Sequence, residues 1–332
     1  MLTSEQVAKY RYDGYLYPVP ALSPDEVAEY NADLARFEEW LGKPVNQGDW
    51  RWRSAAYVFL PWLDRLVRHP SILDAVESLI GPDILVFTST FFIKEANSPT
   101  FAAWHQDATY FGIEPYEHVT AWVALSDATE EAGCMEVVPS RGRPQQMHHA
   151  ALGLKDSING GGQAIIEDFD QGDGEMMALP AGSFSLHHTL CRHRSAPNRA
   201  AHRRVDIGIS YIPAHCRLTG TVRMCAPLVR GRDSGGHFDL LPPPEGEFHP
   251  AALARHVEAY RRYRANYAEQ IEAHDRAFAS VEGVAPRTAL GPALPNYAEQ
   301  IEAHDRAFAS VEGVAPRTAL GPALHLVGRA GE

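Results

Sequence analysis

The stretch Trp104-His105-Gln106-Asp107 carries a histidine and a carboxylate two residues apart, within a run that has strand-like composition. Side chains two apart on a strand project from the same face, so His105 and Asp107 can reach one ion. A second histidine, His193, follows far downstream. Two histidines and one carboxylate are the ligand set that holds non-haem Fe(II) and leaves positions open for a co-substrate and O2. The sequence therefore predicts a metal site on a β scaffold.

Two other His-x-acid triplets occur, and their surroundings differ. His256 and Glu258 lie in a helical pattern, where positions two apart point away from each other. His237 and Asp239 lie in a Gly/Pro-rich loop with no strand-like segment after it to supply a third ligand. For any such triplet taken alone, a solvated surface pair is the ordinary alternative.

Arg204 follows His193 closely enough to lie on the next antiparallel strand. Its planar guanidinium can grip the far carboxylate of a dicarboxylate bound to the metal. The neighbouring Arg203 must face the opposite way on a strand, which makes it the natural comparison.

The middle of the chain changes to short apolar or alternating runs separated by Gly, Pro, Asn and Asp. We expect strands at 84–94, 102–110, 117–125, 134–138, 175–179, 183–190 and 204–212. This pattern predicts a mainly β fold with flanking helices, a double-sheet jelly roll. Residues 140–173 are too long for a turn, so we expect a substrate lid or a disordered loop there.

Helix signals dominate the beginning of the chain. Thr3 to Gln6 and Ser23 to Glu26 both have the capping-box pattern, and a short apolar strand at 15–18 separates the two helices. Residues 71–80 have apolar positions at helical spacing and then meet Gly81-Pro82, which predicts the end of that helix. A last helix begins near Pro250.

Several motifs together are typical of one enzyme family. They are His69-Pro70 to Gly81-Pro82-Asp83, Trp104-His105-Gln106-Asp107, 119–125, Gly133 to Ser140, Ser185-Leu186-His187-His188, His193 to Asn198, and Arg203-Arg204 to Pro213. In these residues, over roughly 3–215, the chain resembles the phytanoyl-CoA dioxygenase family of Fe(II)- and 2-oxoglutarate-dependent oxygenases. One departure is Arg141-Gly142-Arg143, where the family often has a histidine after Pro139-Ser140.

The resemblance implies a double-stranded β-helix, the cupin-like form of the jelly roll. It also implies that His105, Asp107 and His193 are the catalytic iron ligands. Arg204 and Ser195 would then hold the distal carboxylate of 2-oxoglutarate. Fe(II), 2-oxoglutarate and O2 are the implied cofactor and co-substrates.

The expected reaction is hydroxylation of an unactivated C–H bond in a small polar metabolite or natural-product intermediate, with release of succinate and CO2. Related halogenases replace the carboxylate ligand with a small residue, so the presence of Asp107 favours hydroxylation. Desaturation, cyclisation and epoxidation could use the same ligands. A non-oxygenase, cupin-like metal-binding protein is the alternative from another class, because fold alone does not decide function.

Five further residues are candidate substrate contacts, each with a structural alternative. Gln106 is equally a candidate for hydrogen bonding outside the barrel, and Tyr110 and Phe111 for the core. His187 is a candidate structural histidine, and His148, beside His149 in the 140–173 segment, could be solvated.

The composition favours a cytoplasmic enzyme that acts on a small molecule. A formal charge of -12 argues against a nucleic-acid partner. No apolar run is long enough to span a membrane, and no signal-peptide pattern opens the chain. Four cysteines without Cys-x-x-Cys spacing are typical of reduced thiols. A monomer and a homodimer both remain open.

The C-terminal part contains an exact repeat. Residues 266–294 recur unchanged as 296–324. We expect one dioxygenase domain at 1–280, with a helical part at 1–82, a jelly-roll core at 83–215 and a loop and helix at 216–280. Residues 281–332 form a tail with the second copy, which we interpret as a dispensable tandem duplication. The alternative is a dimerisation arm, since Tyr267, Ile271, His274 and Phe278 lie on one helical stripe.

Overall fold

The structure, a computed structural model, describes residues 1–278 as a strand-rich middle with helices at both ends. The strands are β1 Tyr15–Pro20, β2 Ile84–Lys94, β3 Ala102–His105, β4 Ile113–Glu114, β5 Val119–Ala124, β6 Met135–Val138, β7 His149–Ala151, β8 Gln163–Ile165, β9 Glu175–Met177, β10 Ser183–His188, β11 Arg192–Ser195, β12 Arg204–Pro213, β13 Arg217–Leu218, β14 Cys225–Ala226, β15 Leu228–Arg230 and β16 Asp239–Leu240. The helices are α1 Ser4–Asp13, α2 Pro24–Leu41, η1 Val45–Gln47, α3 Trp50–Arg53, η2 Ala56–Val58, α4 Pro61–Val67, α5 Pro70–Ile80, α6 Ala108–Phe111, η3 Gly160–Gly162 and α7 Pro250–Phe278.

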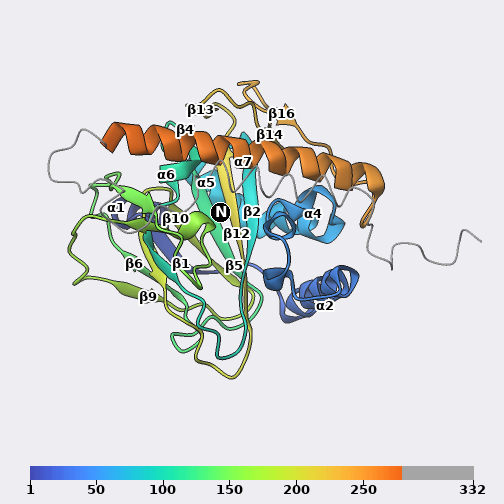
Figure 1. The fold of residues 1–332 in the computed structure, drawn as a ribbon, viewed down its shortest axis with the longest axis horizontal. Helices are drawn as coiled ribbons and strands as arrows, with labels where there is room; N and C mark the ends of the chain where they lie inside the picture. The colour runs from blue at the N-terminus through green and yellow to red at the C-terminus, as the bar shows by residue number, and fades with distance from the viewer. Residues whose placement is uncertain (279–332) are drawn as a thin grey trace, which may run out of the picture.

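Two antiparallel sheets form the body of the protein (Figure 1). The larger has the order β1-β10-β5-β12-β2-β15 and the smaller has the order β3-β11-β6-β9. Strands that follow one another in the chain fall in opposite sheets, as β10, β11 and β12 do. This arrangement confirms the predicted jelly roll with flanking helices.

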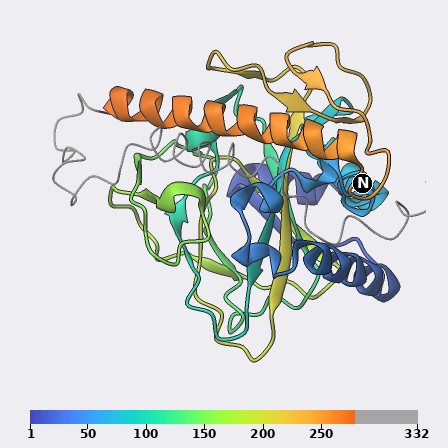
Figure 2. The same cartoon turned by 45° about the vertical axis from the view of Figure 1, so that its right-hand side comes forward.

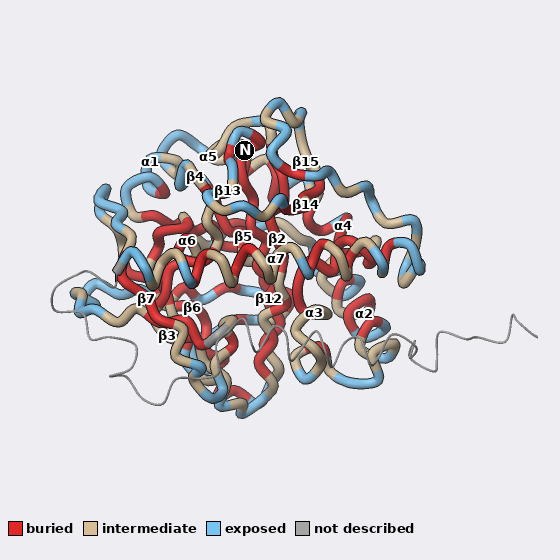
Figure 3. Tube along the Cα trace, turned by 45° about the horizontal axis from the view of Figure 1, so that its top comes forward, coloured by how far each residue is buried: buried red, intermediate tan, exposed pale blue. Residues whose placement is uncertain are grey.

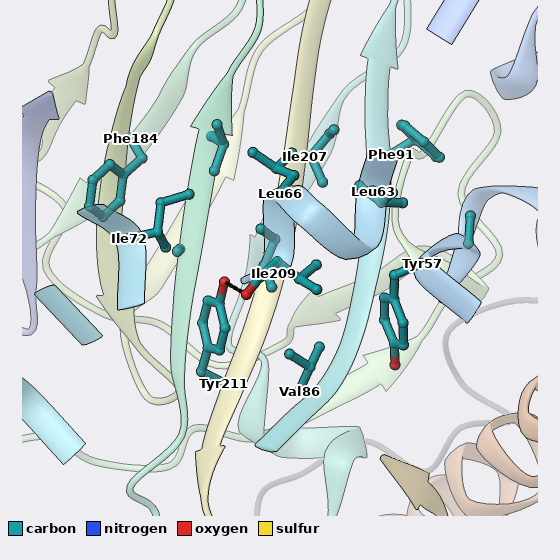
Figure 4. Packing of buried hydrophobic residues seen from close by; sticks show 14 of the residues in the cluster. Tyr57, Leu63, Leu66, Ile72, Val86, Phe91, Phe184, Ile207, Ile209 and Tyr211 are labelled. Atoms are coloured by element: carbon teal, nitrogen blue, oxygen red, sulfur yellow. Dashed lines mark hydrogen bonds between the residues drawn. The ribbon is translucent and has the colours of Figure 1, made fainter. Parts of the chain in front are cut away.

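The larger sheet has one apolar and one polar face, because side chains alternate along its strands. Ile207, Ile209 and Tyr211 of β12 pack in the main core with residues of α4 and α5 (Figure 4). The Tyr211 hydroxyl donates a hydrogen bond to the carbonyl of Val67, 2.8 Å away, which ties the sheet to α4. Gly208 and Ser210, on the other face of β12, line the space between the sheets. The polar face therefore lies where a site can form.

The N-terminal helices begin where their caps predict. The side chains of Thr3 and Ser23 each accept a hydrogen bond from the third helical N–H. The side chains of Gln6 and Glu26 accept one from the backbone N–H of Thr3 and Ser23 respectively. These capping boxes satisfy amide groups that have no partner inside a helix. Helix α5 ends at Gly81, whose φ is +84°, as the Gly81-Pro82 pair predicts.

Helix α7 is the longest helix described and crosses the molecule along its long axis (Figures 1 and 2). It contacts α6, β7 and η2. Tyr267 and Ile271 are buried in a small cluster with Tyr110 of α6. The stripe that could have served as a dimerisation arm therefore packs, over its described part, on the chain's own core. The second copy of the repeat and the 281–332 tail lie outside the described residues.

Two local predictions were wrong. The strand expected at 102–110 ends at His105, because Asp107 has helical backbone angles and α6 follows it. Of the two alternatives for residues 140–173, the disordered loop was wrong, because the segment contains β7, η3 and β8, and β7 pairs with β8. The substrate lid stays a prediction, and Asn159 and Gly160 of this segment line the outer chamber described below. Hydrogen bonds to Gln106 hold this segment in place, as described below.

Burial follows the sheets, with β2, β5 and β12 buried along most of their length (Figure 3). Cys134, Cys191, Cys216 and Cys225 are all free thiols. Among the described helices, none combines the length and the apolar character that crossing a membrane would require.

Candidate functional site

Two histidines and one carboxylate meet between the sheets. His105 Nε2 lies 4.0 Å and His193 Nε2 lies 3.8 Å from Asp107 Oδ1. One possible ligand atom from each of the three residues lies within 4.8 Å of the other two. His105 and His193 come from paired strands, β3 and β11, and are directly opposite each other. Antiparallel pairing thus brings together residues 88 positions apart in the chain (193 − 105).

Both rings are held in the form that a metal ligand needs. The Nδ1 atoms lie 2.8 Å from Ala103 O for His105 and 2.9 Å from Cys191 O for His193. A carbonyl accepts only, so each Nδ1 carries the proton and each Nε2 keeps its lone pair. Burial lowers the pKa of both histidines, which keeps the imidazoles neutral.

Asp107 uses its two oxygens differently. Oδ1 faces the histidines, while Oδ2 accepts a hydrogen bond from the Thr120 hydroxyl at 3.1 Å and lies 3.3 Å from His187 Nε2. Burial would raise the pKa of Asp107, but the His187 contact and the neighbouring histidines hold it below its ordinary value. Thr120 is in turn bonded to His118 Nε2 at 3.1 Å. The arrangement fixes an ionised carboxylate with one oxygen presented to the metal position.

Gln106 anchors the turn between the two ligands. Its side-chain amide donates to Leu190 O at 2.6 Å and its Oε1 accepts from the Met147 N–H at 2.7 Å. Its backbone N–H donates to His149 Nε2 at 2.9 Å. Gln106 is fully buried and its side chain is bonded to backbone groups, so it supports the turn between His105 and Asp107.

A second group of polar residues lies on β2 and β12. Arg204 is buried, with Nε 2.8 Å from Asp206 Oδ2 and Nη1 donating to Gly133 O. Its Nη2 is buried and has no hydrogen-bond partner among the described residues. Lys94 Nζ donates to Ser195 Oγ at 2.7 Å and to Gly133 O at 3.3 Å. The Arg204 guanidinium, the Lys94 amino group and the Ser195 hydroxyl thus lie together, and Arg204 Nη2 lacks an acceptor there.

The charge of Lys94 depends on what lies beside it. Burial, with a smaller contribution from Arg204, lowers its pKa to about 6. Gly133 makes the close approach possible: its φ is +69°, and a Cβ there would collide with Ala196 O. These residues fit a carboxylate, since it would supply the acceptor for Arg204 and the opposite charge for Lys94.

One chamber connects the triad to the surface. Its inner part, lined by the triad, Ser195 and His187, shares Thr90, Phe92, Phe111 and Asn159 with the outer part. The outer part is bounded by Trp50 of α3 and by Tyr260, Tyr263, Arg264 and Tyr267 of α7. It encloses about 660 Å³, open solvent at its mouth included.

Some of the predicted site residues line the chamber, and others do not. The structure brings together His105, Asp107, His193, Ser195 and His187 in the inner chamber, with Phe111 on its wall. Gln106, Tyr110 and His148 do not line this chamber. Tyr110 is buried against Tyr267, and the His148 ring is tilted against the His274 ring, while its backbone N–H donates to Glu167. Arg204 begins the next strand, as predicted, but β12 lies in the opposite sheet from β11, because the chain crosses between the sheets.

Sequence reasoning missed Lys94, Thr120 and the tyrosines of α7. A signal existed for the first two: Lys94 shares strand parity with Thr90 and Phe92, and Thr120 with Trp122, all of which face the interior. Arg203, by contrast, lies on the outer face and pairs with Glu38 and Glu95. Strand alternation thus separates Arg203 from Arg204, as expected.

Comparisons with known proteins agree with this geometry. A family model described as phytanoyl-CoA dioxygenase matches residues 10–205. A probable alpha-ketoglutarate-dependent hypophosphite dioxygenase of Stutzerimonas stutzeri is 24% identical over 226 residues, which cover 64% of this chain and 79% of the relative. An L-proline trans-4-hydroxylase of Streptomyces griseoviridis is 27% identical over 179 residues, covering 46% and 65% respectively.

Solved structures show the same fold. The chain is similar to the non-heme monooxygenase ThoJ, solved without ligand, with a TM-score of 0.71 and 31% identity over 81% of this chain and 99% of that one. CytC3, solved with Fe(II) and alpha-ketoglutarate, superimposes with a TM-score of 0.55 at 20% identity, over 72% of this chain and 93% of that one.

Proposed function

The chain belongs to the phytanoyl-CoA dioxygenase family, and from that membership we propose that it hydroxylates an unactivated C–H bond of a small polar metabolite or natural-product intermediate. It is a 2-oxoglutarate-dependent oxygenase whose cofactor and co-substrate are Fe(II) and 2-oxoglutarate. The observation that carries the proposal is the meeting of His105, Asp107 and His193 at the inner end of a chamber.

Each residue has a proposed role. His105 Nε2, His193 Nε2 and Asp107 Oδ1 hold Fe(II), and this set leaves positions for 2-oxoglutarate and O2. Arg204 Nη2, Lys94 and Ser195 hold the distal carboxylate of 2-oxoglutarate. The Nε and Nη1 atoms of Arg204 already bind Asp206 and Gly133 O. Arg204 therefore offers the carboxylate Nη2, and not the two-nitrogen contact expected of a guanidinium.

When bound, iron and 2-oxoglutarate supply the oxidative chemistry: O2 is activated, 2-oxoglutarate loses CO2 to become succinate, and the second oxygen atom enters the substrate C–H bond. The protein orients the reactants and excludes water. Phe92 and Trp122, stacked at 4.5 Å, form an apolar wall beside the inner chamber. His187 and Thr120 hold Asp107 so that its carboxylate remains a ligand, which favours hydroxylation over halogenation.

Two observations support a small polar substrate. The chamber is lined by aromatic side chains together with a few polar groups, as small-molecule sites are. The names of the relatives refer to hypophosphite, L-proline and ectoine, all small polar molecules. Desaturation, cyclisation and epoxidation remain alternative outcomes on the same site.

We further propose that the enzyme acts in the cytoplasm, as a monomer or homodimer. The support for the compartment is chemical: the four thiols are free, and burial raises the pKa of Cys134, Cys191 and Cys216, which keeps them as unreactive thiols.

A metabolite panel tests the function. The purified protein is supplied with Fe(II), 2-oxoglutarate and O2, and succinate formation is measured with each candidate substrate. We expect substrate-dependent succinate and a product heavier by one oxygen atom. A product that has lost two hydrogens would replace hydroxylation by desaturation or cyclisation. Chlorination in the presence of chloride would contradict the role given to Asp107.

A further inference from the structure

The outer chamber has aromatic walls. Tyr260, Tyr263 and Tyr267 follow one another at three- and four-residue spacing on one side of α7, and Trp50 of α3 lies on the same chamber. Flat rings on several sides suit a flat or ring-shaped body, which can stack on them or meet them edge to face.

The same end of the chamber carries positive charge. Apart from the triad, Arg264 is the charged residue among the described residues that line it, since tyrosines are neutral at physiological pH. Arg264 Cζ lies 6.0 Å from the Tyr260 ring, and both Arg51 and Arg53 are close enough to Tyr260 to interact with it electrostatically. The carboxylate of Asp49 lies 3.8 Å from Arg51 Nε. Three arginines and one carboxylate thus gather there, in a chain whose formal charge is -12.

Arg53 is the unusual member of this group. It is only 6% exposed, and its guanidinium stacks on Trp50 with Cζ 4.1 Å from the ring. Its one hydrogen bond, from Nη2 to Phe91 O, is long at 3.5 Å, and its Nε has no hydrogen-bond partner among the described residues. No described carboxylate lies within 4.0 Å of it, whereas Arg68, Arg203 and Arg230 each have one.

A buried cation without a counter-ion is costly, and it is retained where a ligand supplies the missing charge. Two neighbours of Arg53, Trp50 and Tyr260, line the outer chamber, although Arg53 itself does not. The Phe91 carbonyl that accepts its hydrogen bond lies between Thr90 and Phe92, which line the chamber, while the Phe91 side chain packs in the main core. The guanidinium is therefore placed directly behind the chamber wall. There it can serve a ligand that enters from the mouth.

We propose that the outer chamber binds an oxyanion group of the substrate, carboxylate or phosphate-type, between Arg53 and Arg264, with a ring-shaped or flat body against Trp50 and the α7 tyrosines. This inference rests on the proposed function, because it defines which small molecule reaches the metal. Both arginines present planar donor forks, which match the geometry of carboxylates and phosphates.

Matched ligands test the proposal. The full chain, loaded with Fe(II) and saturating 2-oxoglutarate without oxygen, is titrated by calorimetry with benzoate, phenyl phosphate and benzamide. Benzoate and benzamide share a shape and differ in charge. We expect at least one of the two anions to bind about tenfold or more tightly than benzamide, equivalent to about 1.4 kcal/mol. The tighter anion identifies the group as a carboxylate or a phosphate.

Variants locate the anion. Arg264→Gln and Arg53→Gln should each abolish the preference for the anion, whereas Arg261→Gln, an exposed arginine of α7 paired with Glu258, should keep it. If Arg53→Gln does not fold, Arg53→Lys and Arg264→Gln still decide the matter. Equal binding of benzamide and the anions, absence of binding by all three, or an equal loss in Arg261→Gln would overturn the proposal.

Failure of this inference is distinguishable from failure of the proposed function. Binding of 2-oxoglutarate to the Fe(II)-loaded protein without oxygen, measured by calorimetry on the same preparation, reports on the metal and co-substrate site alone. If it is present while the anion preference is absent, the anion subsite is wrong and the oxygenase assignment stands. If it is absent, the assignment itself fails.

Discussion

Asp107 illustrates how single residues determine the chemistry of this site. One of its oxygens is turned to the metal position because Thr120 and His187 hold the other, at 3.1 and 3.3 Å. Partners of this kind fix the orientation of a metal ligand, and their loss typically weakens metal binding about 10- to 100-fold.

Thr120→Val and His187→Gln should therefore each weaken Fe(II) binding by about 10-fold or more, without 2-oxoglutarate present. Valine keeps the shape of threonine and removes the hydroxyl donor. The control is His202→Gln, because His202 is exposed and its ring lies against the Asp127 carbonyl, away from the triad. Titration of the apo-protein with Fe(II) measures the effect. Unchanged affinity in both variants would show that neither residue positions Asp107.

Arg204→Lys should raise the 2-oxoglutarate requirement by at least about tenfold, because one ammonium cannot replace contacts made by three nitrogens of the guanidinium. Arg203→Lys is the matched control, since Arg203 lies on the outer face with Glu38. The measurement is the 2-oxoglutarate dependence of succinate formation. A larger effect of Arg203→Lys than of Arg204→Lys would instead place the co-substrate on the outer face of β12.

The lowered pKa of Lys94 predicts proton uptake when 2-oxoglutarate binds. Its pKa in the free protein is about 6, so it is neutral at about pH 8. A carboxylate bound beside it favours the charged form and raises its pKa, so 2-oxoglutarate binding should take up protons at that pH. Calorimetry in two buffers of different ionisation enthalpy counts them. Lys94→Met should lose the uptake, and equal uptake in variant and parent would remove Lys94 from the co-substrate site.

At the scale of elements, the 140–173 segment is part of the site's support. β7 brings His149 against the turn at Gln106, and the His149 N–H donates to His274 Nε2 of α7 at 3.0 Å. The segment and α7 are therefore connected to the turn that carries His105 and Asp107. A change in either can reach the metal position through this contact.

His149→Phe should cost about 1–3 kcal/mol of unfolding free energy, because it leaves the buried Gln106 N–H without an acceptor. His149→Gln retains an acceptor and should cost less. Urea unfolding of the two variants gives the comparison, and Fe(II) titration shows whether the turn has moved. If both variants are equally stable, the hydrogen bond to Gln106 contributes little.

The elements also show what the sequence could predict. β2 and the capped helices α1 and α2 were predicted closely, because their signals are local: alternation, caps and stop residues. β3 was predicted too long because the Trp-His-Gln-Asp-Ala-Thr-Tyr run has strand-like residues throughout, and only tertiary bonds from Gln106 impose the turn. The proposed ligands were predicted because, of the three His-x-acid triplets, only the first is followed by a strand-like segment with a histidine and an arginine, and because these residues resemble the family's motifs. Lys94 and Thr120 were missed although strand parity placed them on the inner face, because the sequence does not give the sheet order that brings their strands to the triad.

At the scale of the whole molecule, two sheets with opposite roles create the site. The smaller sheet supplies His105, His193 and Ser195, while the larger supplies Lys94, Thr120, His187 and Arg204. The outer face of the larger sheet is covered by α2, α4 and α5, and α7 borders the mouth. Neither sheet alone could bind both a metal and a dicarboxylate.

Succinate formation in 18O-labelled O2 tests that joint site most directly. The purified chain is given Fe(II), 2-oxoglutarate, labelled O2 and the substrate found with the metabolite panel, and succinate and CO2 are counted. We expect equal amounts of both, one labelled oxygen atom in succinate, and dependence on Fe(II). His105→Ala and His193→Ala should remain folded, since ligands beside an open chamber support little of the core, and should form none. Absence of succinate from the folded, iron-loaded protein, or its retention in either variant, would contradict the assignment.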